Sequence, residues 1–170
     1  MARVRLIEER DQASASQMEV FDHIVSSRGR MLRPFAVMLH RPEIARATAD
    51  LGAVLRYAST LSDHDRELVI VITAVERDCA FELDAHRPLA AEAGVAPETI
   101  TAVADGGDVA DARDAAIVAY VRALTRTGTA DDTTFHGAHD IFGDEGVVEL
   151  TAIVGYYTML AMSMNAVQAC

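Results

Sequence analysis

The sequence predicts an all-α protein, a compact bundle of about seven or eight helices. Ala, Val, Leu and Met supply most of the apolar residues, and Trp is absent. Such chains favour helices because these side chains lose little rotamer freedom there. Apolar residues recur with helical spacing along most of the chain. No segment offers itself as a partner for a β-strand, and a lone strand cannot satisfy its backbone hydrogen bonds.

Length and charge restrict the organisation and the partners. The 170 residues suffice for one domain with a hydrophobic core and favour one domain over two, so we expect a single domain over residues 1–170. The formal net charge is -11, and Lys and Arg form no basic stripe. We therefore expect no nucleic acid and no anionic membrane as a partner. The N-terminus lacks the apolar stretch of a secretory signal, so a cytoplasmic protein is expected.

The helices of the first half follow from apolar spacing and from their end signals. Three helices are expected, over residues 17–27, 31–40 and 42–57. Pro42 suits a first turn, where its missing N–H costs nothing. Ser62 is the clearest cap: its hydroxyl can accept from backbone N–H groups, and the acidic residues of Asp63-His64-Asp65 suit the positive helix end. Residues 68–75 are rich in β-branched side chains, but the cap and the total length favour a buried helix over a strand.

The second half is predicted in the same way. The expected helices cover residues 78–93, a short stretch after Pro97, 111–125, 133–142 and about 145–166, with a turn at 105–108 and helix ends at Gly94 and Gly143. Residues 151–170 carry no charge and approach the length of a membrane span. Polar residues interrupt this segment and no Lys or Arg flanks it, so a helix buried in a core or in a subunit interface is favoured.

One segment concentrates the residues that carry chemistry. On a helix over 78–93, Cys79, Glu82 and His86 fall within an arc of ~60°, so a thiol, a carboxylate and an imidazole face the same way. Glu82 and His86 are four residues apart and within reach of each other. Such a pair can exchange protons near neutral pH, as general acid–base catalysis requires. The same spacing also occurs in pairs that only face solvent, and a cysteine on a helix usually behaves as a small hydrophobe.

The segment over residues 61–95 resembles the core of the carboxymuconolactone decarboxylase family, which includes the alkylhydroperoxidase D-like proteins. The residues that carry this resemblance are Leu61, Ser62, Arg66, Glu67, Leu68, Cys79, Glu82, His86, Ala90, Gly94 and Val95. Weaker similarities extend to Phe21–Gly29, Leu39–Ala45 and Phe142–Asn165, and so to nearly the whole chain. The resemblance implies an all-α fold assembled as a trimer or a hexamer, with a small-molecule substrate and no cofactor.

The resemblance also implies residue roles. In the peroxidase members a glutamate, a CxxC pair and a histidine form a proton relay and a redox dithiol, and Glu67, Cys79 and His86 match three of these positions. Glu82 occupies the position of the second cysteine, and a carboxylate cannot form a disulfide. The resemblance therefore favours an enzyme that uses Glu82 and His86 as an acid–base pair on a small organic acid or lactone, as a decarboxylase, another lyase or an isomerase. Glu67 would orient His86 or act as a second acid.

Two other functions stay open. The first is a thiol peroxidase in which an external thiol resolves Cys79, and the second is a non-catalytic helical oligomer that acts as a binding module. With only Cys79 and the terminal Cys170, the chain has no disulfide scaffold, and we expect Cys79 to form no intramolecular disulfide. Alkylation of Cys79 separates the first two functions, because only the peroxidase depends on its thiol.

Other polar residues are candidates for binding. Arg33 and Arg66 are candidate substrate-binding residues, because arginine binds carboxylates bidentately, and Tyr57 is a candidate for the pocket wall. His136 and His139 share a helix face, as metal ligands can, but no third ligand has convincing spacing. The sequence therefore predicts no metal site.

Overall fold

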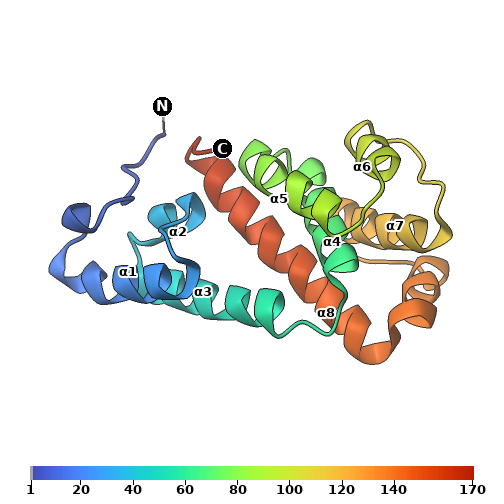
Figure 1. The fold of residues 1–170 in the computed structure, drawn as a ribbon, viewed down its shortest axis with the longest axis horizontal. Coiled ribbons are helices and arrows are strands. Elements are labelled where there is room, and N and C mark those ends of the chain that lie inside the picture. Colours follow the sequence, from blue (N-terminus) through green and yellow to red (C-terminus); the bar gives the residue numbers. More distant parts are fainter. Residues whose placement is uncertain (1) are drawn as a thin grey trace. The chain divides into compact units, whose positions relative to one another are not determined.

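Every regular element among residues 2–170, which the computed structural model describes, is helical. These residues form eight α-helices and one short 3-10 helix, Arg10–Gln12 (Figure 1). The prediction of an all-α fold is confirmed. The helices belong to two compact units, one made of the chain up to Ala58 with Met162–Cys170 and the other of Ser59–Ala161. A single family domain over residues 1–170 stays a prediction.

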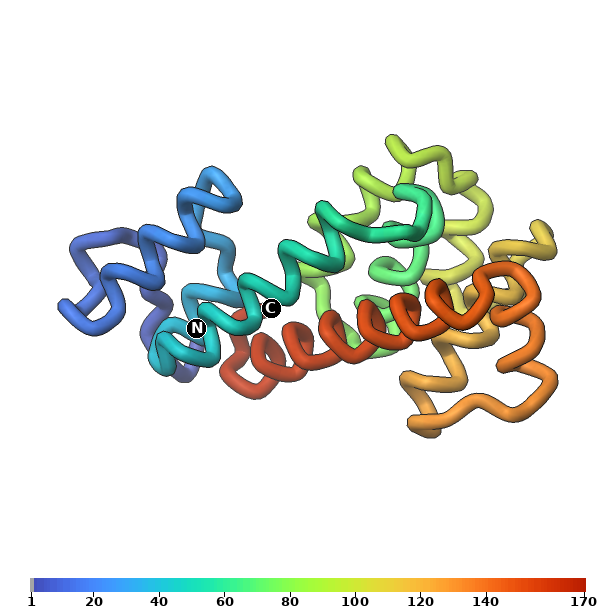
Figure 2. The backbone as a smooth tube through the Cα atoms, turned by 90° about the horizontal axis from the view of Figure 1, so that it is seen from below, coloured from blue at the N-terminus to red at the C-terminus, as the bar shows by residue number. Residues whose placement is uncertain are grey.

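The first unit contains α1 (Ala15–Arg28), α2 (Arg33–Met38) and α3 (Pro42–Tyr57), drawn in blue to teal in Figure 2. A capping box between Ser14 and Gln17 opens α1, and Gly29 ends it in a left-handed conformation, with φ 76°. Fully buried side chains from all three helices form the core: Ile24, Ala36, Ala45 and Ala49. The end of the chain joins this unit, because the backbone N–H of Arg3 donates to the carbonyl of Val167 over 2.7 Å.

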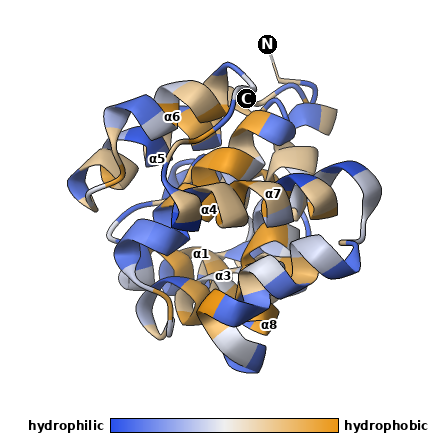
Figure 3. Ribbon diagram, turned by 90° about the vertical axis from the view of Figure 1, so that its right-hand side faces the viewer, coloured by the Kyte–Doolittle hydropathy of each residue, from blue (hydrophilic) through white to orange (hydrophobic). Residues whose placement is uncertain are grey.

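The second unit is built around α4 (Asp63–Glu76), which packs against α5 (Ala80–Glu92), α6 (Pro97–Ala104) and α7 (Ala112–Thr127). Residues 68–72 are all fully buried, and Figure 3 shows α4 mostly in the orange of apolar residues. The β-branched run is thus a buried helix, as predicted. The Ser62 cap accounts for its start, since the Ser62 hydroxyl accepts from the backbone N–H of Asp65 over 3.1 Å.

The last helix, α8 (Asp132–Ala166), bends at Gly143, where φ is 64° and ψ is -173° (Figures 1 and 2). The predicted helix end at this residue is confirmed. A Cβ atom at Gly146, one turn later, would lie 2.6 Å from the Cβ of Phe142, so only glycine fits there. By length and composition α8 is apolar enough to cross a membrane, but half of its apolar window is buried in the protein. Core helices of soluble proteins have the same composition.

Candidate active site

A tight turn joins the two helices that carry the candidate residues. The backbone N–H groups of Asp78 and Cys79 donate back to the carbonyls of Val75 and Ala74, each over 3.0 Å, and Asp78 is left-handed, with φ 48°. These bonds close α4. Cys79 is therefore the N-cap residue of α5, and the prediction of a helix from residue 78 is wrong by two residues. Cys79 therefore comes just before the helix that carries Glu82 and His86, rather than within it.

The imidazole of His86 lies between two glutamates inside the second unit. Its Nδ1 atom is 2.7 Å from Glu67 Oε2, a hydrogen-bond distance, and its Nε2 atom is 3.5 Å from Glu82 Oε2. Glu67 comes from α4, whereas Glu82 and His86 come from α5 one turn apart. All three residues are buried, at 3%, 4% and 6% exposure. The predicted contact between Glu82 and His86 is present, but the shorter one joins His86 to Glu67.

Two further groups surround these three residues. Tyr157 of α8 packs edge-on against the imidazole, with ring centroids 5.2 Å apart, and Tyr156 packs against Tyr157. The Nε atom of Arg66 lies 3.7 Å from Glu67 Oε1, while its Nη2 atom donates to Asp63 over 2.9 Å. The tyrosines restrain the imidazole ring, and Arg66 places positive charge beside Glu67. The sequence offers Tyr156 and Tyr157 as possible pocket residues, but it does not pair Tyr157 with His86, because the two residues are 71 positions apart in the chain.

This arrangement can hold and pass protons. When Nδ1 of His86 carries a proton and donates it to Glu67, Nε2 is the atom left for proton exchange. Glu82 stands on that side, at a distance that a small side-chain shift turns into a hydrogen bond. The cluster of Glu67, Glu82 and His86 is therefore suited to general acid–base chemistry.

The thiol of Cys79 is buried, at 1% exposure, whereas Cys170 is exposed, and neither cysteine is part of a disulfide. Among the predicted substrate-binding residues, Arg66 belongs to the same unit as the cluster and lies beside Glu67. Arg33 and Tyr57 belong to the first unit, where Arg33 donates to the carbonyl of Ala169 over 3.4 Å and Tyr57 is 68% exposed. Their roles stay predictions.

The two histidines considered as metal ligands have other partners nearby. His139 pairs with Asp144 over 2.9 Å and stacks on Phe135, and His136 also contacts Phe135. Within residues 2–170, no group of three or more His, Cys, Asp or Glu side chains has the geometry to hold a metal ion.

The fold and the site together describe an all-helical protein with a buried Glu–His–Glu cluster. The model of the carboxymuconolactone decarboxylase family matches residues 42–128, which run from the start of α3 to the end of α7 and include Glu67, Cys79, Glu82 and His86. The chain belongs to the carboxymuconolactone decarboxylase family. No curated protein matches its sequence.

Solved structures of distant relatives share the fold. An uncharacterised peroxidase-related protein with the alkylhydroperoxidase AhpD core, from Ralstonia eutropha JMP134, is 18% identical, with a TM-score of 0.79 over 99% of this chain and 91% of its own. A protein of unknown function from Agrobacterium tumefaciens, proposed to be an antioxidant defence protein AhpD, is 21% identical, with a TM-score of 0.69 over 77% and 92%. A variant of the debrominase Bmp8 in complex with 2,3,4-tribromopyrrole is 15% identical, with a TM-score of 0.77 over 100% and 93%. At these identities the likeness shows the fold alone.

Proposed function

We propose that this protein is a cofactor-independent enzyme that transfers protons on a small organic acid or lactone. Glu82 and His86 form its acid–base pair, and Glu67 orients the imidazole. One observation carries the proposal: a buried imidazole with one nitrogen 2.7 Å from a carboxylate of the neighbouring helix and the other 3.5 Å from a carboxylate of its own. A purely structural histidine needs only one hydrogen-bond partner. A histidine that exchanges protons needs one ring nitrogen held by a partner and the other ring nitrogen facing a second acid or base.

The chemistry follows from this division of roles. In a decarboxylation, the bond to the leaving carboxylate breaks, CO2 departs, and the electron pair is delocalised over a neighbouring carbonyl as an enolate. Glu82 or His86 then delivers a proton to the carbon that held the carboxylate. In an isomerisation the same pair removes a proton from one carbon and returns it to another. Arg66 is the proposed anchor for a substrate carboxylate, because arginine binds carboxylates bidentately.

Burial strengthens these interactions, because water is excluded from the cluster and electrostatic effects increase in such surroundings. The same burial requires the surrounding side chains to move before a substrate can reach Nε2 of His86. We propose that Tyr157 of α8 is the side chain that moves, because its ring packs against the imidazole.

A thiol reaction at Cys79 is the second candidate, favoured by the position of this residue at the N-terminus of α5, where the helix dipole supports a thiolate. The thiolate would attack the O–O bond of a hydroperoxide, form a sulfenic acid and release an alcohol protonated by His86. Two equivalents of an external thiol would then reduce the sulfenic acid to the thiol, giving water and the external disulfide. The peroxidase-related description of the relative from Ralstonia eutropha is consistent with this candidate.

Turnover of two substrate panels, carboxylated γ-lactones and alkyl hydroperoxides with dithiothreitol, separates the candidates. We expect Glu82→Gln to lower lactone turnover by about 10²-fold, the usual scale for a general acid or base, and His86→Ala to lower it at least as much. The double variant should lose little beyond either single variant, because groups that act as a unit are not additive. Glu92→Gln, an exposed carboxylate on the same helix, is the matched control and should retain activity.

The decisive comparison is with Cys79→Ser. Retained lactone turnover in Cys79→Ser supports acid–base chemistry. Loss of activity in Cys79→Ser together with full activity in Glu82→Gln would refute it and make the thiol the reactive group. If neither panel is turned over by the wild-type protein, the non-catalytic binding module becomes the better account.

A further inference from the structure

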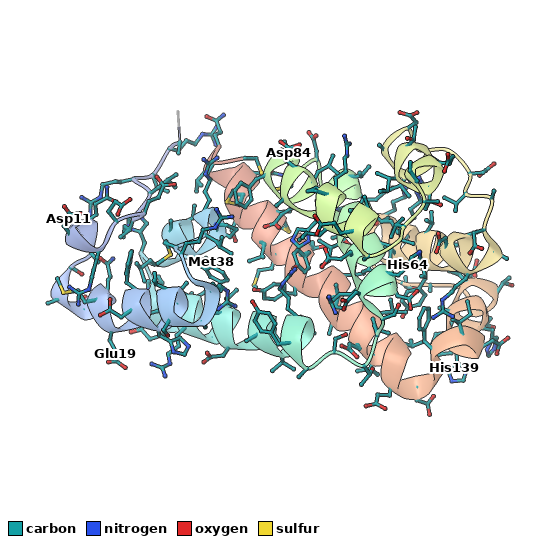
Figure 4. The ribbon with its side chains drawn as sticks, viewed as in Figure 1. Asp11, Glu19, Met38, His64, Asp84 and His139 are labelled. Carbon is teal, nitrogen blue, oxygen red and sulfur yellow. The ribbon has the colours of Figure 1, made fainter. Side chains whose placement is uncertain are left out.

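A second group of polar residues, separate from the His86 cluster, lines an open hollow of about 570 Å³ in the second unit. It lies where the N-terminal ends of α4, α6 and α7 approach one another, and His64, labelled in Figure 4, marks its α4 side. A volume of this size is typical of small-molecule pockets. The polar side chains that line it include Ser62, His64, Asp65, Thr99, Arg113 and Asp114.

Two of the charges in this pocket satisfy each other. Arg113 donates to both carboxylate oxygens of Asp65, over 3.1 Å and 2.8 Å, and the hydroxyl of Ser62 donates to the same carboxylate over 2.7 Å. Burial raises the pKa of Asp65, but the bonds from Arg113 and Ser62 outweigh it, so the pKa lies below its usual value. The pair is therefore an ionised salt bridge at neutral pH, and Arg113 offers little positive charge to a ligand.

Asp114 is less well compensated. This residue is only 4% exposed, and its Oδ2 atom accepts one long hydrogen bond, 3.3 Å, from the hydroxyl of Thr99. Its Oδ1 atom lies 3.7 Å from Nε2 of His64 and accepts no hydrogen bond from the residues that the structure describes. Burial, opposed in part by His64, raises the pKa of Asp114. A nearly buried carboxylate thus lines the pocket with one oxygen still able to accept.

The remaining charges decide which ligand fits. His64 is also 3.5 Å from Asp65, and Asp111, which lines the pocket as well, accepts from the backbone N–H groups of Arg113 and Asp114. Three carboxylates therefore face one guanidinium and one imidazole, and the pocket keeps an excess of negative charge even when the imidazole is protonated. A metal ion is disfavoured, because no group of His, Cys, Asp or Glu within the described residues has metal-binding geometry.

From this geometry we infer that the pocket binds a small organic cation, a protonated amine whose N–H groups donate to Asp114. An ammonium group supplies both the positive charge and the donors that Oδ1 of Asp114 lacks. The aliphatic part of such a ligand would contact Gly94 and Ala96, which form the apolar wall. None of the lining residues belongs to the His86 cluster, so the inference is independent of the proposed reaction.

The test is a titration of the full-length protein with n-butylammonium chloride at constant ionic strength, followed by backbone amide NMR shifts. Butanoate and n-butanol are the probes matched in length that carry the opposite charge and no charge. We expect saturable shifts around residues 62–65, 96–99 and 111–114 with butylammonium alone. Asp114→Asn should weaken binding by about tenfold or more, the usual effect of removing a charged hydrogen-bond partner.

Two further variants keep the test decisive. Asp105→Asn removes an equal charge from a different hollow, beside Arg87 and Pro97, and should bind butylammonium as the wild type does. Ala96→Leu fills the pocket without changing its charge and should weaken binding even if Asp114→Asn fails to fold. The inference is overturned if butanoate produces the same shifts, if the shifts with butylammonium scatter over the acidic surface, or if Ala96→Leu binds with unchanged affinity.

Discussion

Substitution of His86 by alanine removes the partner that two buried carboxylates share. Glu67 and Glu82 are 3% and 4% exposed, so neither can recover its lost interaction from water. Removing one member of a buried ionic group costs about 3–5 kcal/mol, since the charges that remain lose a buried partner. A single domain is stabilised by only about 5–15 kcal/mol in total. For a chain of this size the loss corresponds to a decrease in Tm of about 10 °C.

Urea unfolding followed by circular dichroism at neutral pH measures this loss directly. His136→Ala, which truncates an exposed histidine, is the matched control and should change the free energy of unfolding by less than about 0.5 kcal/mol. The triple variant His86→Ala, Glu67→Gln, Glu82→Gln should recover part of the loss at neutral pH. A loss below about 1 kcal/mol in His86→Ala at neutral pH would refute the reasoning.

Three other predictions concern assembly, redox state and pH. Val148 and Met159, 70% and 37% exposed on α8, belong to an apolar surface that we expect to be covered in an oligomer; light scattering that gives a monomer at micromolar concentration would reject this. Thiol titration of the native protein should find Cys79 and Cys170 reduced, and a bridge between them in a mass map would contradict the prediction. A hydrogen bond from Arg126 on α7 lowers the pKa of Glu76 from its ordinary value of 4.5. The ionised Glu76 carboxylate therefore stabilises the fold above pH 4.5, and this stabilisation is lost as the pH falls through the lowered pKa of the folded state. Glu76→Gln should therefore destabilise the protein to urea at pH 7 by about 1–3 kcal/mol but not near pH 2; an equal loss at both would contradict this.

The helices and their ends were predictable, because the signals that set them are local. Ser62 caps α4 through a backbone group three residues away, and Gly143 breaks α8 with its own dihedral angles. The start of α5 was misplaced by two residues, since helical spacing does not show where the N–H groups of Asp78 and Cys79 donate. Those donors close the preceding helix, and only the backbone path of the turn reveals it.

The sequence by itself determined which residue types share a face of α5, since a helix places Glu82 and His86 one turn apart whatever surrounds it. It did not determine which carboxylate holds the imidazole more closely. That choice depends on the packing of α4 against α5, which brings Glu67 to 2.7 Å from His86 across 19 residues of chain. The acidic residues around His64 likewise indicate only a helix cap in the sequence. The fold adds the contacts of Arg113 with Asp65 and of Asp114 with His64. Periodicity reports the neighbours of a residue along its own helix, whereas partners on other helices are set by packing, and in this protein those partners define both polar sites.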